Sequence, residues 1–176
     1  SHAPIEGAIN LKKKYNIISS DIKAINVSTY LLAVIGHDHI DIQGITSAKM
    51  STPYGVAVAF ETGKAGLHEF LPEYINNRKI IELTKKVKVI EDKKLSELVP
   101  EKRAAIVEII TVDGKSYIER VNYPKGEPES PMTVEDVEQK FISMAMYAGK
   151  TEAEARGMIQ KFWNIEDNCS ALFDML

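Results

Sequence analysis

The chain has 176 residues, of which 44% are hydrophobic and 27% charged, and its formal net charge at pH 7 is −3. This composition is typical of a globular protein and excludes disordered and fibrous classes. The 22 lysines and arginines are scattered, so no basic patch predicts binding to nucleic acid or to a membrane surface. No apolar run approaches the ~20 residues that a membrane-spanning helix needs, so we expect a cytoplasmic protein. The single cysteine, Cys169, excludes an internal disulfide.

The first predicted elements are a helix and a strand. Ile5, Ala8 and Ile9 lie on one helical stripe close to the start of the chain. After a turn-rich segment at 19–21, apolar and polar residues alternate over residues 25–35. This period of two predicts a strand over residues 25–35.

The string His37-Asp38-His39-Ile40-Asp41 is the most metal-like part of the sequence. In an extended chain the side chains of His37, His39 and Asp41 would point to one side, which is a possible geometry for zinc. No further pair of cysteines or histidines completes a ligand set. We therefore interpret the string as a polar loop and predict no metal.

Residues 46–64 predict the helix around which the chain is organised. Ser51 or Thr52 suits the N-cap, and Pro53 suits the first helical position, where its missing N–H costs nothing. Gly63 suits the C-terminal stop. The residues between are small or apolar, which predicts a buried helix that packs closely on a neighbour.

Tyr54 lies in the first turn of this predicted helix, and we expect that turn to be open. Lys49 and Ser51 lie just upstream. Free N–H groups and the helix dipole favour an anionic ligand at such a position. The pattern alone favours the simpler interpretation, which is a capped core helix with an ordinary tyrosine.

Several short elements and a hairpin are predicted after the central helix. The short elements are a helix or turn at 67–75, a helix at 78–86, a strand at 87–90 and a helical turn at 93–98. The hairpin joins residues 105–112 to 115–123 through Asp113-Gly114, which suits a type I′ turn. A two-residue loop would place Ile109 opposite Ile118 and Ile110 opposite Tyr117.

A segment with three prolines and a glycine, residues 124–131, marks a boundary. Beyond it, two capping-box patterns begin at Thr133 and Thr151 and predict two helices, and residues 171–175 suggest a third. The predicted class is α+β. Residues 1–131 form a domain with a small antiparallel sheet and packed helices, and residues 132–176 form apolar helices that need a further surface to pack on.

The common enzyme motifs, such as a nucleophile elbow, a phosphate loop or a dinucleotide fingerprint, are absent. Three stretches in the same order nevertheless resemble one family. The segment 2–8, HAPIEGA, resembles its histidine followed by an Ile-Asp/Glu-Ala-Ala helix, and the segment 47–54, SAKMSTPY, resembles its Ala-Lys-Phe-Ser-x-x-Tyr pattern. The segment 123–128, YPKGEP, followed by Lys140-Phe141, resembles its Pro-Arg-Gly-x-Pro and Lys-Phe pattern. The family is MmgE/PrpD, which includes 2-methylcitrate dehydratase, cis-aconitate decarboxylase and iminodisuccinate epimerase.

The resemblance covers only the C-terminal part of such an enzyme. It implies that residues 1–131 form an α+β lid domain and that residues 132–176 pack on an N-terminal all-α domain absent from this sequence. It also implies a lyase without metal or organic cofactor that moves a proton next to a carboxylate of a small di- or tricarboxylate. Loss of water, loss of CO₂ or epimerisation would follow. We expect a homodimer, and we expect this fragment to be inactive alone.

The resemblance also implies roles for four residues. Tyr54 matches an active-site tyrosine and would act as general acid or hydrogen-bond donor. His2 matches a histidine that would orient a carboxylate or move a proton, the alternative being a vector remnant. Lys49 and Ser51 are candidates for contacts to substrate carboxylates.

Two other functions stay open from the sequence. One is a non-catalytic α+β interaction module that docks a partner through its C-terminal helices. The other is a metal-binding domain centred on His37 and His39.

Overall fold

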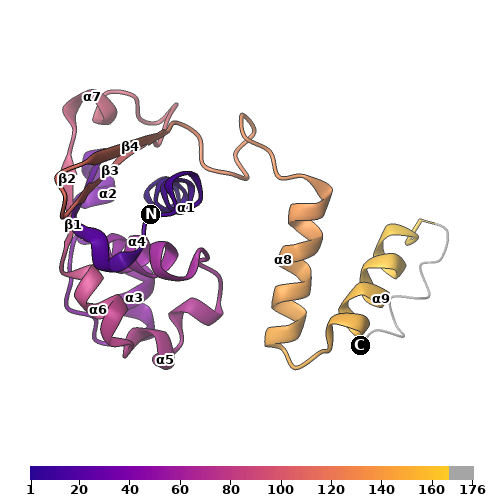
Figure 1. The fold of residues 1–176 in the computed structure, drawn as a ribbon. Coiled ribbons are helices and arrows are strands. Elements are labelled where there is room, and N and C mark those ends of the chain that lie inside the picture. Colours follow the sequence, from indigo (N-terminus) through magenta and orange to yellow (C-terminus); the bar gives the residue numbers. More distant parts are fainter. Residues whose placement is uncertain (167–176) are drawn as a thin grey trace. The chain divides into compact units, whose positions relative to one another are not determined.

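The computed structural model describes residues 1–166. Its backbone forms two compact units, Ser1–Ser130 and a second unit that begins at Pro131. The first unit combines a four-stranded sheet with helices, and the described part of the second contains two helices (Figure 1). The α+β class is therefore confirmed. No helix within residues 1–166 combines the length and the apolar character that crossing a membrane requires.

The first unit mixes short helices with four strands. The strands are β1 (Ile22–Thr29), β2 (Val87–Glu91), β3 (Ala105–Thr111) and β4 (Ser116–Val121). The α-helices are α1 (His2–Tyr15), α2 (Leu31–Val34), α3 (Ile45–Met50), α4 (Thr52–Thr62), α5 (Pro72–Ile75), α6 (Arg78–Thr84) and α7 (Lys93–Ser96). Two 3₁₀ turns are η1 (Ser19–Asp21) and η2 (His68–Phe70). The short elements predicted between residues 67 and 98 are thus confirmed, with slightly different ends.

The strands lie in the order β2-β1-β3-β4. β3 pairs antiparallel with β4, as the predicted hairpin requires, and also antiparallel with β1, whereas β2 pairs parallel with β1. A parallel pair needs a long crossover connection, and the segment from α2 to α6 supplies it. The sheet is therefore mixed and not wholly antiparallel. α1 packs against β3 and β4, and α4 packs against β2, so these helices line the sheet.

The central helix α4 has the ends and the burial that its sequence predicts. Ser51 is the N-cap, and its side chain accepts a hydrogen bond from the Tyr54 amide. Gly63 ends the helix in the left-handed region, with φ 78°. α4 lies so close to α1 that a Cβ added at Gly55 would be 2.9 Å from Ile5 Cδ1. The small residues of α4 therefore serve close helix packing.

β1 is shorter than the strand predicted over residues 25–35. It ends at Thr29, whose neighbours across the sheet are Glu91 at the end of β2 and Ala105 at the start of β3. Beyond this point no partner strand continues, and the chain turns into α2. The prediction was wrong for residues 30–35 because alternation alone does not reveal where the partner strands stop.

The hairpin of β3 and β4 forms, but its register differs from the predicted one. Ile109 lies opposite Tyr117, because the Thr111 amide donates to the Lys115 carbonyl and leaves a three-residue loop. Gly114 in that loop has φ 85°. The Asp-Gly pair suits both two-residue and three-residue hairpin loops, so the sequence alone did not fix the register.

The described part of the second unit is a pair of helices, α8 (Val134–Tyr147) and α9 (Glu152–Trp163). Both begin with the predicted capping boxes, at Thr133 and Thr151. Phe141 and Phe162 pack edge to face, with ring centroids 5.5 Å apart. Large apolar side chains stay exposed on this unit, namely Val134, Val137, Met144, Met146, Tyr147 and Trp163. The helix suggested at 171–175 lies outside the described residues.

Candidate active site

Ser51 holds the first turn of α4 in place. Its hydroxyl accepts from the Tyr54 amide at 3.1 Å and donates to the His39 carbonyl at 2.6 Å. The Thr52 amide donates to the His37 carbonyl at 2.8 Å. The loop before α3 is thereby joined to the start of α4, and the Ser51 side chain is buried.

The Tyr54 side chain is enclosed, with 1% of its surface exposed. Its hydroxyl donates to the Glu69 carbonyl at 2.6 Å, and its ring packs on Phe70. Burial raises the pKa of Tyr54 well above its usual range, and the nearby Glu69 and Tyr74 raise it further. The expected open first turn is therefore closed by η2, and the phenol is a neutral hydrogen-bond donor.

His2 is the first residue of α1, and its side chain is exposed. The hydroxyls of Ser1 and Thr52 lie 2.9 Å apart, so the starts of α1 and α4 are in contact. The structure thus brings together the two helix ends that carry His2 and Tyr54. The two side chains nevertheless point to different places. The Tyr54 hydroxyl donates to the Glu69 carbonyl, whereas His2 lines a surface cavity.

The cavity beside His2 has a volume of about 200 Å³. Its polar lining comes from four separate parts of the first unit, namely Ser1 and His2, Thr29 and Tyr30, Arg103, and Glu127. Ala3, Pro4, Ala33 and Pro124 complete the wall. The sequence does not point to Tyr30 or Arg103, which lie in no motif, or to Glu127, which stands at the unspecified position of the Pro-Arg-Gly-x-Pro pattern.

The sheet explains why these residues meet. Thr29 at the end of β1 lies opposite Ala105 at the start of β3, and the Thr29 hydroxyl donates to the Ala104 carbonyl at 3.0 Å. Tyr30 and Arg103 flank this pair directly. Ala3, next to His2, packs on Ala105 and Val121 in a small buried cluster. Pairing of two strands and packing of one helix therefore place all three side chains around one point.

The loop wall of the cavity is fixed to α1. The Glu6 carboxylate accepts a hydrogen bond from the Lys125 amide at 2.7 Å. The Gly126 amide donates to the Ser130 carbonyl at 2.7 Å, and Gly126 has φ 103°, which favours glycine. This proline- and glycine-rich loop, which the sequence predicts to be irregular, therefore has a defined shape next to His2.

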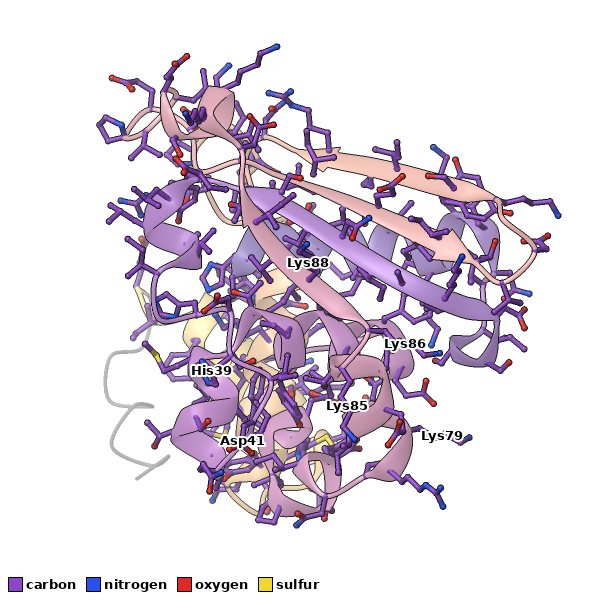
Figure 2. All side chains as sticks on the ribbon, turned by 90° about the vertical axis from the view of Figure 1, so that its left-hand side faces the viewer. His39, Asp41, Lys79, Lys85, Lys86 and Lys88 are labelled. Atoms are coloured by element: carbon purple, nitrogen blue, oxygen red, sulfur yellow. The ribbon has the colours of Figure 1, made fainter. Side chains whose placement is uncertain are left out.

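Lys49 and the histidine string lie outside this cavity. Lys49 is exposed in the last turn of α3. His37 Nδ1 contacts the Met50 carbonyl at 2.8 Å, and His39 Nε2 contacts the Ser47 carbonyl at 3.1 Å. Figure 2 shows His39 and Asp41 on the same side of the unit. Among residues 1–166 no group of three or more histidine, cysteine or acidic side chains has the arrangement of a metal site.

Several lysines lie near β2 and outside the cavity. Figure 2 labels Lys79 on α6, Lys85 and Lys86 between α6 and β2, and Lys88 on β2. Lys85 pairs with Glu82 at 3.2 Å, and Lys86 Nζ donates to the Ile22 carbonyl at 2.6 Å. Two of the four lysines are thus engaged within the unit.

These features define an α+β domain with a small polar cavity at the junction of a helix end, a strand end and a loop. Comparison with protein families identifies the domain further. The model of the MmgE/PrpD C-terminal domain matches residues 1–165, so the chain belongs to this family, as its three ordered motifs predict. Comparison with curated proteins gives no match.

Proposed function

We propose that the chain is the C-terminal part of a cofactor-independent enzyme that acts on small di- or tricarboxylates. The observation that carries this proposal is the family match over nearly the whole chain, together with the His2 cavity. The family includes 2-methylcitrate dehydratase and cis-aconitate decarboxylase, so the proposed reaction moves a proton at a carbon next to a carboxylate. A cytoplasmic homodimer is part of the proposal.

His2 is the proposed proton-transfer group. An imidazole ring can both accept and return a proton through its nitrogen atoms, which suits a general acid–base group. The side chain is exposed and lines the cavity. A small carboxylate in this space would therefore lie within reach of the ring.

Tyr54 is the proposed hydrogen-bond donor to the leaving hydroxyl or to the developing enolate. Its raised pKa supports this role, because the phenol keeps its proton at neutral pH and above. The role also has a structural requirement. In this structure the Tyr54 hydroxyl donates its hydrogen bond to the Glu69 carbonyl. To act on a substrate, the hydroxyl has to break that hydrogen bond and donate to the substrate instead.

Ser51 and Lys49 take different parts in the proposal. The Ser51 O–H is already used on the His39 carbonyl, so we assign Ser51 to positioning the first turn of α4. Lys49 is exposed at the neighbouring turn and could reach a ligand carboxylate only from outside the His2 cavity. We therefore propose it as a contact to a distal carboxylate of a larger substrate.

Residues 132–176 are proposed to pack on an N-terminal helical domain. The exposed apolar side chains of α8 and α9 support this, because large apolar surfaces on a folded unit mark interaction sites. The same observation favours the second candidate function, a non-catalytic module that docks a partner through these helices. A measurement of turnover distinguishes the enzyme from the docking module.

The test combines the chain with an N-terminal helical domain of the same family and measures dehydration of 2-methylcitrate and decarboxylation of cis-aconitate. We expect turnover by the combination, none by the chain alone, and a fall of about 10²–10⁴ in kcat for His2→Asn, the usual scale for a general acid–base group. Lys79→Gln, on α6 and outside the cavity, is the control and should leave turnover unchanged. Binding of the helical domain without turnover of any small polycarboxylate would instead support the docking module.

A further inference from the structure

We infer that Arg103 and Tyr30 form, with His2, a binding subsite for one carboxylate group, and that Glu127 orients the ligand within it. The inference rests on the proposed function for the reaction, but the binding itself is a separate property of this cavity. Arg103 and Tyr30 belong to none of the three motifs that the sequence shares with the family.

The strongest observation is that the polar groups of the cavity lack partners. Among the described residues, neither the Arg103 guanidinium, the Tyr30 hydroxyl nor the His2 ring makes a hydrogen bond or an ion pair. Other polar side chains nearby, such as Thr29, Thr52 and Glu6, are all engaged. Three donors that share one cavity and have no acceptor in the protein are suited to an anionic ligand.

Arginine is well suited to this position. Its planar guanidinium donates two parallel hydrogen bonds to a carboxylate, whereas a lysine offers only a point charge. The cavity volume of about 200 Å³ is below the ~300–1,000 Å³ typical of pockets for drug-sized ligands, so it fits a small organic acid.

Glu127 places a negative charge in the same cavity as the positive charge of Arg103. Its carboxylate lines the same space as Arg103, yet the two charges form no ion pair within the described residues. A ligand carboxylate is attracted to Arg103 and repelled by Glu127. The ligand therefore binds with its carboxylate at Arg103 and with an uncharged group, such as a hydroxyl, towards Glu127. The subsite is thus selective for a carboxylate that carries a hydroxyl on the neighbouring carbon, as one end of malate does, and any second carboxylate of the ligand lies outside it.

The walls are rigid enough to hold this arrangement. Arg103 and Tyr30 adjoin the Thr29 to Ala104 hydrogen bond, and the loop with Glu127 is joined to α1 through the Glu6 to Lys125 bond. The backbone from which these side chains extend is therefore fixed, so that binding a ligand requires ordering of the side chains alone.

The test is a titration of the full 176-residue chain with malate, followed through the ring resonances of His2 by NMR. The unaltered chain should show a saturable shift of these resonances. Arg103→Gln should weaken malate binding about tenfold or more, the scale of a lost charge-assisted bond, and Arg103→Lys should recover part of it. Glu127→Gln should tighten binding several-fold, and Arg78→Gln on α6, outside this cavity, should change nothing.

The comparison of Arg103→Gln with Arg78→Gln separates a site from a general charge effect, because both substitutions remove one positive charge and only Arg103 lines the cavity. The inference is overturned if the His2 resonances do not move with malate, if Arg103→Gln binds like the unaltered chain, or if Arg78→Gln weakens binding as much as Arg103→Gln. Malate binding needs no turnover. An inactive combined enzyme with Arg103-dependent binding would remove the proposed function and leave the subsite in place.

Discussion

The hydroxyl of Tyr54 has a structural function in this chain whatever its catalytic one. It donates to a backbone carbonyl, that of Glu69, inside a region with almost no exposed surface. A buried carbonyl that loses its partner keeps the cost of its desolvation, so the hydrogen bond contributes to stability. It also fixes η2 over the first turn of α4.

Tyr54→Phe removes this hydrogen bond and keeps the ring. We expect the free energy of unfolding to fall by about 1–3 kcal/mol, because the Glu69 carbonyl is left buried without a donor. Urea unfolding followed by circular dichroism measures the change. Tyr15→Phe is the matched control, since its hydroxyl makes no hydrogen bond among the described residues. Equal stability of Tyr54→Phe and the unaltered chain would show that the hydroxyl is free in solution, which would strengthen its proposed catalytic role.

At the scale of single residues, the sequence predicts what local chemistry decides. Ser51 and Gly63 were found because caps depend on a few neighbouring residues. The burial of Tyr54 was missed because the covering segment, η2, lies further along the chain. Arg103 and Tyr30 were missed for a similar reason, since only the pairing of β1 with β3 brings them together.

The contact between α1 and the sheet is the element-scale feature on which the position of His2 depends. Gly7 allows this contact, because a Cβ added there would lie 2.8 Å from Val107 Cγ2 and 3.3 Å from Val107 Cβ. Val107 is fully buried and, being β-branched, has little freedom to turn away. The helix and the strand would have to separate to admit a methyl group.

Gly7→Ala should therefore destabilise the first unit by about 1–2 kcal/mol, since overpacking outweighs the better helix propensity of alanine. Gly157→Ala is the opposite case within α9, because a Cβ there meets no atom within 4 Å. It should raise stability by up to about 1 kcal/mol. Thermal unfolding of both variants checks the signs. A stabilised Gly7→Ala chain would mean that α1 lies further from β3 than the structure shows.

Elements with strong local signals were predicted, and their partners in the sheet were not. The capping boxes at Thr133 and Thr151 and the Asp-Gly hairpin all formed. The hairpin register slipped by one residue because the loop length depends on how Thr111 and Lys115 pair. The end of β1 was missed because it depends on strands that begin more than fifty residues away in the sequence.

For the whole molecule, the order of the strands decides where a site can form. β1 is central and pairs with both β2 and β3, so its end at Thr29 meets elements from distant parts of the chain. The cavity lies at that end, and α1 brings His2 to it. Composition and motifs predicted the α+β class and the family, whereas the cavity required the three-dimensional pairing.

The exposed apolar helices of the second unit lead to the last prediction, which uses the single tryptophan of the chain. Trp163 ends α9, is 59% exposed and donates from its indole N–H to Glu138 at 2.7 Å. Its fluorescence should therefore be that of a hydrated indole and should be readily quenched by acrylamide. Binding of an N-terminal helical domain should shift the emission to shorter wavelength and reduce quenching, because the apolar surface of α8 and α9 becomes covered.

Val137→Lys, on the exposed surface of α8, should weaken this response by placing a charge in the contact. Ile118→Lys is the matched control, since Ile118 is similarly exposed but lies on β4 in the first unit. If the two variants respond alike, the helices after residue 131 are not the docking surface. If Val137→Lys alone loses the fluorescence change, the helical domain binds to these helices, and the His2 cavity can then be tested in the combined enzyme.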